Sequence, residues 1–345
     1  MTESKIFDAL VFIGRFQPIH LGHLKVFEKG LSQADRLYVL VGSTEQPRNL
    51  RNPFTFIERA QMVQACVSAP DRTSVLALPD IAYNDQAWIS TVQEIVEQQL
   101  RADGLNPATA RVGLIGHEKD ATSYYLSLFP QWDSLGVPPY ERLSATGLRD
   151  GYFRDRAIDQ ANLPETTIAF LQQFQDSEAY AALHEERAFI DIYREGWQAS
   201  PYPPTFVTVD AVVIQSGHVL LVKRRAFPGK GLSALPGGFV NVDEPLVDAM
   251  IRELREETRL KVPEPVLRGS IKGSRVFDDP HRSARGRTIT HAYLIQLTPH
   301  ADGLPMVKGG DDAAKALWLP LANLDSRRMF EDHYHIIQAM LSMAE

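Results

Sequence analysis

Apolar and polar positions follow a repeating two-part pattern between residues 8 and 129. Short apolar runs alternate with longer segments in which apolar residues recur every three or four positions. The runs are typical of buried strands, and the longer segments are typical of amphipathic helices. Strands are expected at 8–14, 36–43, 74–80 and 111–117, with helices at 20–34, 55–69, 85–102 and 121–129. This alternation predicts βαβ units around a parallel sheet, whose ligands would gather at the carboxyl ends of the strands.

The pattern changes after residue 163. Residues 164–198 keep a helical period and open with Pro and Glu, which suit a first helical turn, so one or two helices are expected. The stretch SPYPPTF that follows has three prolines in seven residues and cannot continue a helix. We therefore expect a first domain at 1–175, a helical and proline-rich linker at 176–203, and a second domain at 204–345.

The second half combines several strands with one strongly charged helix. A turn at Ser216-Gly217 joins the first two strands, and a glycine-rich loop, FPGKGLSALPGGF, precedes the helix. Strands are expected at 206–215, 218–225, 288–297 and 315–321, with helices at 245–260 and 333–344. This order predicts a mixed α+β domain behind the α/β first domain.

Composition and charge narrow the range of functions. The 345 residues are 44% hydrophobic and 23% charged, which is enough apolar material for two separate cores. A net charge of −7 argues against a broad basic face for nucleic acid. The single cysteine, Cys66, excludes an internal disulfide and a cysteine-based zinc cluster. The N-terminus lacks signal-peptide features, and no apolar run reaches the ~18 residues of a membrane span. A cytoplasmic protein without a membrane partner is expected.

Two histidines stand at the first junction of strand and helix, in FIGRFQPIHLGHLKVFEKG. His20 and His23 could bind phosphate, pack in the core or hold a metal, and the local sequence leaves these three roles open. A metal site would need a third ligand, which the nearby sequence does not supply, and a core role suits a turn poorly. Phosphate is favoured because a helix N-terminus offers N–H groups and a positive dipole end. Gly14 and Gly22 would let a ligand approach the backbone.

The charged helix of the second half carries three carboxylates on one face. Glu253, Glu256 and Glu257 fall within an arc of about 100° at the α-helical rotation per residue. One interpretation is a solvated acidic face that neighbouring arginines compensate. The other is a site for Mg²⁺ or Mn²⁺, because these cations prefer clustered oxygen ligands, with a carbonyl from the preceding glycine loop.

Two motifs in the first half carry a family resemblance. GRFQPIHLGH and LSATGLRDGYFR resemble the signatures of the nucleotidyltransferase superfamily, and in particular the archaeal-type nicotinamide mononucleotide (NMN) adenylyltransferases. The resemblance implies that His20 and His23 hold the ATP phosphates, that Ser144 and Thr146 donate to them, and that Arg149 binds the departing pyrophosphate. His20, His23 and Arg149 would be catalytic. The full ATP-binding set that it implies is Gly14, Arg15, Phe16, His20, His23, Ser144, Thr146 and Arg149.

Other segments of this half extend the resemblance. PDIAYNDQAW would bind NMN through Asp80, Asn84 and Trp88, and Trp88 would either stack on the nicotinamide ring or simply pack its helix. Arg48 and Arg51, in PRNLRNPFTFIER, are further candidates for phosphate binding. Mg²⁺ would arrive with ATP.

The charged helix resembles a Nudix box, G-x5-E-x7-R-E-U-x-E-E-x-G-U, where U is aliphatic. The chain follows this spacing from Gly238 to Leu260, except that Arg259 replaces the last glycine, which normally ends the helix in a left-handed conformation. The resemblance implies metal binding by Gly238, Glu253, Glu256 and Glu257, of which the three glutamates would be catalytic, with Arg252 and Glu244 orienting them. The segment FDDPHRSARGRTITHAYLI resembles the ADP-ribose pyrophosphatase branch, with Arg282, Arg285 and Arg287 as candidate ADP-ribose contacts.

Together the motifs resemble a bifunctional bacterial family along the full chain. The expected architecture is a Rossmann-like nucleotidyltransferase domain with a parallel sheet, followed by an α+β Nudix domain. The implied reactions are NMN plus ATP to NAD plus pyrophosphate, and Mg²⁺-dependent hydrolysis of ADP-ribose to AMP plus ribose 5-phosphate. The alternatives are a Nudix half that senses a ligand without hydrolysis or acts on another nucleoside diphosphate derivative, and a first half with a different acceptor. The expected partners are the small molecules ATP, NMN and ADP-ribose, and a homodimer remains open.

Overall fold

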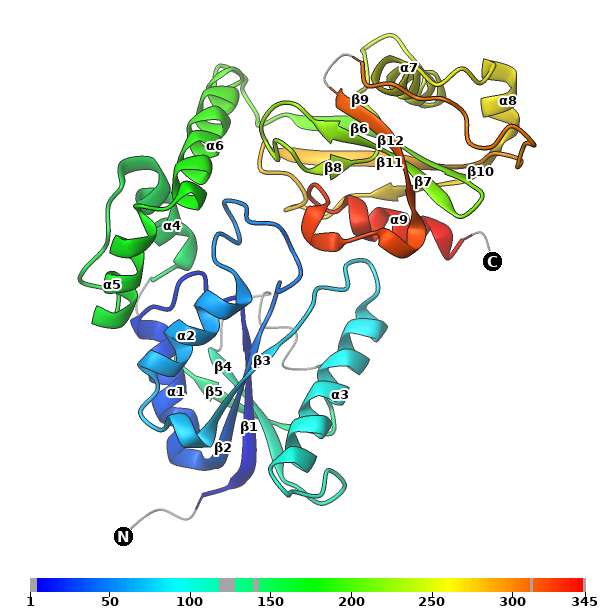
Figure 1. Ribbon diagram of the computed structural model, residues 1–345. Helices are drawn as coiled ribbons and strands as arrows, with labels where there is room; N and C mark the ends of the chain where they lie inside the picture. Colours follow the sequence, from blue (N-terminus) through cyan, green and yellow to red (C-terminus); the bar gives the residue numbers. More distant parts are fainter. Residues whose placement is uncertain (1–4, 118–127, 139–142, 311–312, 344–345) are drawn as a thin grey trace. The chain divides into compact units, whose positions relative to one another are not determined.

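The computed structural model describes residues 5–117, 128–138, 143–310 and 313–343 (Figure 1). The chain forms two compact units, 1–185 and 186–345. The helix expected at 121–129 falls mainly on residues outside the described ranges. Within those ranges no helix is long and apolar enough to span a membrane.

The first unit is built on a five-stranded sheet with the order β3-β2-β1-β4-β5. All neighbouring pairs are parallel, which confirms the prediction from the alternation of strands and helices. The strands are β1 (Phe7–Gly14), β2 (Ala34–Val41), β3 (Thr73–Ala77), β4 (Val112–His117) and β5 (Asp133–Val137). Because β1 is central, ligands that bind at the carboxyl ends of the strands would lie near Gly14.

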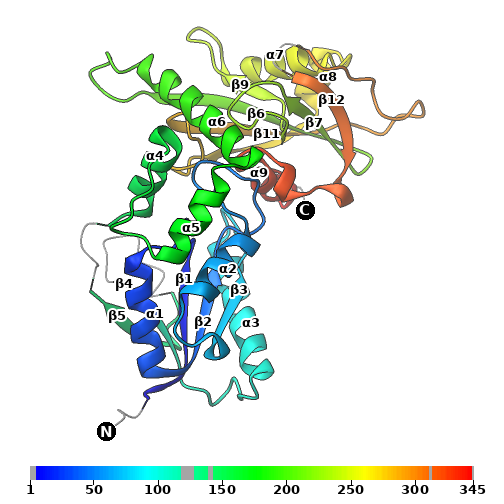
Figure 2. The same cartoon turned by 60° about the vertical axis from the view of Figure 1, so that its left-hand side comes forward.

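Helices cover both faces of this sheet (Figures 1 and 2). Alternate residues of β1 enter separate cores: Leu10 and Phe12 pack in one, Ala9 and Val11 in the other. The first core includes the apolar stripes of α1 and α2, and the second includes that of α3. The helices of this unit are α1 (Leu21–Gln33), α2 (Phe56–Cys66), α3 (Asp85–Ala102), α4 (Ala145–Asp155), α5 (Glu165–Phe174) and the start of α6 (Glu178–Glu195).

One strand of this unit was not expected from the sequence, and one expected helical region proves to be two helices. Strand β5 was not expected, because Asp133–Val137 contains a glycine and a charge and has no alternating pattern. Pairing with β4 supplies the order that its own residues do not. The expected helical region at 164–198 forms two helices, and α6 continues across the division between residues 185 and 186.

The second unit is built on a mixed seven-stranded sheet. Its main path is β10-β11-β6-β7-β12, with β8 paired to β7 and β9 paired to β6, and only the β11–β6 pair on this path is parallel among the described strands. The strands are β6 (Thr205–Gln215), β7 (His218–Arg224), β8 (Ser233–Ala234), β9 (Gly237–Phe239), β10 (Ile271–Phe277), β11 (Arg287–Gln296) and β12 (Ala313–Pro320). The helices are α7 (Leu246–Thr258), α8 (Glu264–Gly269) and α9 (His333–Leu341). The turn between β6 and β7 has positive φ at Ser216 and Gly217, as a tight hairpin requires.

Helix α7 packs against one face of this sheet. Ala249, Met250 and Leu254 are buried with Val209 and Val213 of β6. Thr208 and Asp210 alternate with these valines, so they point to the opposite face, where Asp210 contacts Thr290 of β11. This packing holds α7 beside β9, the strand that contains Gly238.

Candidate active sites

His20 and His23 lie where the sequence places them, at the start of α1. His20 is the N-cap residue, with extended backbone angles (φ −138°, ψ 170°) and 6% exposure. Its backbone N–H donates to Nδ1 of His23 at 3.2 Å, and the two rings stack with centroids 3.7 Å apart. Because Nδ1 of His23 accepts this bond, the neutral imidazole carries its proton on Nε2. The second ring nitrogen is therefore a hydrogen-bond donor at a helix N-terminus.

Arg149 joins the second motif to the first. Ser144 is the N-cap of α4, and its Oγ accepts from the N–H of Gly147 at 3.5 Å. Arg149, only 6% exposed, donates from Nη2 to Thr146 Oγ1 at 3.2 Å and from Nη1 to the carbonyl of Gln17 at 2.8 Å. The last contact spans 132 positions of sequence and brings the two motifs to one end of the sheet.

Two buried arginines, Arg59 and Arg149, and the half-buried Arg15 lie close together at this end of the sheet. Burial lowers the pKa of Arg15 to about 9, and those of Arg59 and Arg149 to about 10; nearby Arg51 lowers the pKa values of Arg15 and Arg149 further. None of these three has a carboxylate within 4 Å among the described residues. Nη1 of Arg15 is buried, and within the described ranges it has no hydrogen-bond partner. Buried cations with no carboxylate in direct contact suit a polyanionic ligand, because its charge would add to the more distant charges of Asp80, Glu58 and Asp150.

Sequence reasoning missed Arg59. Its guanidinium donates to the carbonyls of Arg15 (2.7 Å), Gly42 (2.6 Å), Ser43 (3.0 Å) and Thr55 (3.2 Å). These bonds tie the carboxyl ends of β1 and β2 to the start of α2. One signal in the sequence was available: Arg59 occupies the same buried helical face as Met62 and Val63, where a charge needs polar partners.

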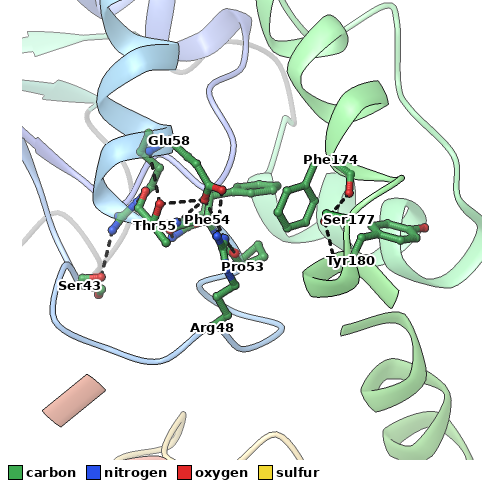
Figure 3. A network of polar contacts seen from close by, with 11 residues as sticks. Ser43, Arg48, Pro53, Phe54, Thr55, Glu58, Phe174, Ser177 and Tyr180 are labelled. Atoms are coloured by element: carbon green, nitrogen blue, oxygen red, sulfur yellow. Dashed lines mark hydrogen bonds and ion pairs between the residues drawn. The ribbon is translucent and has the colours of Figure 1, made fainter. Parts of the chain in front are cut away.

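Arg48 and Arg51 have different surroundings. Arg48 binds Glu58 through both terminal nitrogens, at 2.7 and 2.9 Å, and donates to the carbonyl of Pro53 at 2.7 Å (Figure 3). Its charge is thus compensated within the protein, and it helps to fix the start of α2. Arg51 is exposed and close enough to Arg15 to lower its pKa. Of these two candidates, Arg51 has the surroundings of a phosphate ligand.

The expected NMN segment follows β3 at the same end of the sheet. Asp80 Oδ2 accepts from Gln46 at 2.6 Å, and its charge acts on Arg15. Asn84 caps α3 by accepting from the N–H of Ala87 at 3.1 Å. Trp88 is half-buried and packs near Phe129, with ring centroids 6.2 Å apart. Trp88 therefore packs its helix against the core, and its stacking on the nicotinamide ring stays a prediction.

On α7, Arg252 donates hydrogen bonds to three carboxylates of the Nudix-like segment. It binds both oxygens of Glu244, at 2.6 and 2.9 Å, and also Glu253 at 2.8 Å and Glu256 at 3.1 Å. The hydrogen bonds from Arg252 hold the pKa of Glu244 at about 2. Glu244 and Arg252 are therefore bound to each other, as the orienting role that the resemblance implies would require.

Glu253 and Glu257 lie against the glycine loop. A Cβ added to Gly238 would lie 2.6 Å from the carboxyl carbon of Glu253, so a larger residue here would displace that carboxylate. The N–H of Gly237 donates to Glu257 Oε2 at 3.0 Å. Burial, and then the charges of Glu253 and Asp210, raise the pKa of Glu257 to about 8. Burial also raises the pKa of Glu253.

This arrangement fits a divalent cation. The donors are all oxygens, and two carboxylates with raised pKa values would regain their charged form beside a cation. Among the described residues no three acidic, His or Cys side chains already stand at ligand spacing. Arg252 lies between Glu253 and Glu256, so a cation at these carboxylates would replace its contacts.

The three arginines after β10 play unequal parts. Arg282 is buried in a bidentate pair with Asp332, at 2.9 and 3.0 Å. Arg287 binds Asp278. Arg285 lies over the ring of Phe239, 5.1 Å from its centroid, and Phe239 directly follows Gly238. Arg285 is thus the member of this set that the structure places beside the Nudix-like loop.

Arg259 adopts the conformation that the missing glycine would provide. Its φ of 50° and ψ of 29° are left-handed, and it ends α7.

Arg259→Gly should stabilise the second unit by about 1 kcal/mol, because a side chain is strained in this region of backbone angles, and should leave catalysis unchanged. Calorimetry would show the shifted transition. Arg255→Gly, in the helical part of α7, is the matched control and should destabilise the second unit by about 1 kcal/mol. If both changes destabilised this unit, the backbone at Arg259 would not be strained.

Two family models match the chain, one in each half. Residues 11–98 match the Cytidylyltransferase-like family, and residues 204–340 match the NUDIX domain family. Fold and sites together define a nucleotidyltransferase domain joined to a Nudix domain.

Individual relatives extend this class to the whole chain. A nicotinamide/nicotinic acid mononucleotide adenylyltransferase of Acinetobacter baylyi is 41% identical over 52% of this chain and 93% of its own length. An ADP-ribose pyrophosphatase of Methanocaldococcus jannaschii is 35% identical over 38% of this chain and 70% of its own. The crystal structure of a bifunctional NMN adenylyltransferase/ADP ribose pyrophosphatase from Francisella tularensis, complexed with AMP and a Mn ion, matches at a TM-score of 0.90. It is 34% identical and covers 99% of this chain and 100% of its own. The chain belongs to this bifunctional family.

Proposed function

We propose that the protein is a bifunctional enzyme of NAD metabolism. The first unit joins NMN to the adenylyl group of ATP, forming NAD and pyrophosphate. The second unit hydrolyses ADP-ribose to AMP and ribose 5-phosphate. One observation carries the proposal: both motif sets are present, with Arg259 as the departure from the Nudix box, in a chain that matches the Francisella protein from end to end. We propose domains at 1–175 and 204–345 with a linker at 176–203, small-molecule partners and a cytoplasmic location.

Adenylyl transfer follows from the buried cations of the first unit. The 5′-phosphate of NMN attacks the α-phosphorus of ATP, and pyrophosphate leaves, so the protein must position two anions and neutralise growing charge. Arg15 and Arg149 supply positive charge that no carboxylate of the described residues compensates within 4 Å. His23 donates from Nε2, since its Nδ1 accepts from His20. Asp80, Asn84 and Trp88 remain our proposed contacts for NMN.

Hydrolysis uses the acidic face of α7. Glu253, Glu256, Glu257 and the carbonyl of Gly238 would hold Mg²⁺, or Mn²⁺ in its place. When bound, such a cation polarises the phosphate and lowers the pKa of a water. Glu244 keeps Arg252 in place, and Arg252 holds the side chains of Glu253 and Glu256 together until a cation replaces those contacts. Arg285, beside Phe239, is placed to bind a phosphate or ribose of ADP-ribose.

The test uses the purified full-length protein with Mg²⁺ and chromatographic detection of products. NMN with ATP should yield NAD, and ADP-ribose alone should yield AMP. NAD without AMP would support the Nudix half as a sensor or as a hydrolase of another nucleoside diphosphate derivative. AMP without NAD would mean a different acceptor. Nicotinic acid mononucleotide is the first one to try, since the Acinetobacter relative is named for both mononucleotides.

Metal affinity of the second unit should depend on pH. The pKa of Glu257 is raised to about 8, so below pH 8 a proton occupies the carboxylate that the metal needs. Affinity for Mn²⁺ should therefore rise about tenfold per pH unit up to pH 8 and then level off. Calorimetric titrations between pH 6 and 9 would measure this. Glu257→Gln should flatten the profile, and a wild-type affinity independent of pH would contradict the assignment.

A further inference from the structure

Three consecutive residues at the start of α9 contact two different parts of the second unit. His333 is buried, the side chain of Asp332 is 11% exposed, and Glu331 adopts a left-handed φ of 45°. The sequence showed this region only as the start of an apolar terminal helix. Their partners belong to two segments that we name by position. The metal-side loop is residues 233–238, which ends at Gly238, and the substrate-side loop is residues 278–286, which contains Arg285.

His333 holds the metal-side loop. Nδ1 of its buried ring accepts from the N–H of Leu235 at 2.9 Å. A backbone N–H cannot give up its proton, so Nδ1 must be the unprotonated nitrogen, and burial lowers the pKa of this imidazole accordingly. Nε2 then faces Asp210 of β6, whose Oδ1 is 4.0 Å away and whose Oδ2 accepts from Thr290. The imidazole thus spans from the sheet to the loop.

The next contact of that loop leads to the carboxylates. Two residues after Leu235, the N–H of Gly237 binds Glu257, and Gly238 lies against Glu253. The carbonyl of Pro236 is also fixed, because the N–H of Ala211 donates to it at 2.8 Å. Only Pro236 separates Leu235 from Gly237, so loss of the bond to His333 would loosen one end of the segment that faces α7. His333 contacts none of the glutamates in the contacts described.

Asp332 holds the substrate-side loop. Its two oxygens bind Arg282, whose side chain is 3% exposed. A guanidinium so enclosed and so paired is poorly placed to bind substrate as well. Glu331 adds a second buried carboxylate, which interacts with Arg282 and Arg285. Asp332 thus pairs directly with Arg282, whereas Arg285 lies over the ring of Phe239.

We propose that His333 and Asp332 are positioning residues that set the two walls of the Nudix site independently, His333 through Leu235 and Asp332 through Arg282. The proposal rests on ADP-ribose hydrolysis by this unit. It reassigns Arg282 from a substrate contact to a link between Asp332 and the loop of Arg285. The two residues should have separable effects. His333 should govern metal affinity and kcat, whereas Asp332 should govern KM for ADP-ribose.

The first test replaces His333 in the full-length protein. His333→Leu removes the acceptor for Leu235 and should weaken Mn²⁺ binding and lower kcat for ADP-ribose by at least about 10-fold, as losing an outer partner of a metal ligand does. His333→Asn places an amide oxygen near the position of Nδ1 and should restore both to within about threefold. Gln338→Ala, at an exposed position of the same helix, is the control and should change neither. Equal loss in the Leu and Asn variants would overturn the role of the acceptor.

The second test addresses Asp332. Asp332→Asn should raise KM for ADP-ribose by about 10-fold with Mn²⁺ affinity unchanged, and Arg282→Lys should do the same. If the two act through each other, the double variant should be no worse than either single variant. Additive effects would mean that Arg282 binds substrate directly, and loss of Mn²⁺ binding in Asp332→Asn would overturn the separation of the walls.

Two readouts separate misfolding and failure of the proposed reaction from failure of this inference. A calorimetric unfolding transition of the second unit, measured on the same variants, reports that this unit is folded and should be retained. Mn²⁺ titration needs no hydrolysis, so the His333 variants remain informative if the wild type cleaves no ADP-ribose. In that case the proposed reaction is wrong, and unchanged Mn²⁺ affinity in His333→Leu would overturn the inference as well.

Discussion

His23→Ala should lower NAD synthesis by about 100-fold or more and leave ADP-ribose hydrolysis unchanged. Losing one preorganised hydrogen-bond donor to a developing phosphate charge has an effect of this order. His23 is such a donor, because its Nδ1 is engaged by the N–H of His20 and its proton is therefore on Nε2. Steady-state rates for both reactions, measured on one preparation, would provide the comparison.

A control on the same helix makes this result specific. Lys25 is exposed and faces away from the histidine pair, so Lys25→Ala should change neither rate appreciably. His23→Gln keeps a donor near Nε2 and should recover part of the activity. Equal loss of both activities in His23→Ala would point to misfolding, and an unchanged rate of NAD synthesis would remove His23 from the catalytic set.

Glu257→Gln should have the opposite pattern, with hydrolysis lowered by about 100-fold or more and NAD synthesis unchanged. Even outer partners of metal ligands are worth 10- to 100-fold, so loss of a ligand should cost at least the upper end of that range. Glutamine keeps the shape and can still accept from the N–H of Gly237, so the loop should stay in place while the charge is lost.

The matched control makes the same chemical change at a partly exposed position. Asp248, in the first turn of α7, has a side chain that is 44% exposed and pairs with Arg268. Asp248→Asn should therefore affect hydrolysis little. Mn²⁺ affinity should fall in Glu257→Gln and stay unchanged in Asp248→Asn. If Glu257→Gln hydrolysed ADP-ribose at the wild-type rate, the acidic face would be a solvated one after all.

Hydrophobic periodicity carried most of the secondary structure. The helix expected at 85–102 is α3 at the same residues, and the strand expected at 206–215 lies within β6. These elements bury regular stripes, so each can be read from its own residues. Strand β5 and helix α8 were not predicted from the sequence, because they are short and lack such stripes.

Motif spacing likewise determined much of the candidate sites. The interval from Gly238 to Glu257 placed a glycine loop against an acidic helix face, and it also placed Arg252 on Glu244. These contacts are close in sequence or follow from a single helical period. Even the departure at Arg259 could be interpreted locally, since a helix end requires the left-handed conformation whichever residue occupies it.

Only the tertiary structure decided which charges are compensated. Arg48 and Arg51 look alike in the sequence, yet Arg48 is bound by Glu58 and Arg51 stays near Arg15. Arg282 and Arg285 look alike too, yet Asp332 binds Arg282, 50 positions away. Partners so distant come together through packing of whole elements, which no local period records. The sequence therefore determined the elements and the chemical groups of this protein, and the fold decided which of those groups have a partner inside the protein.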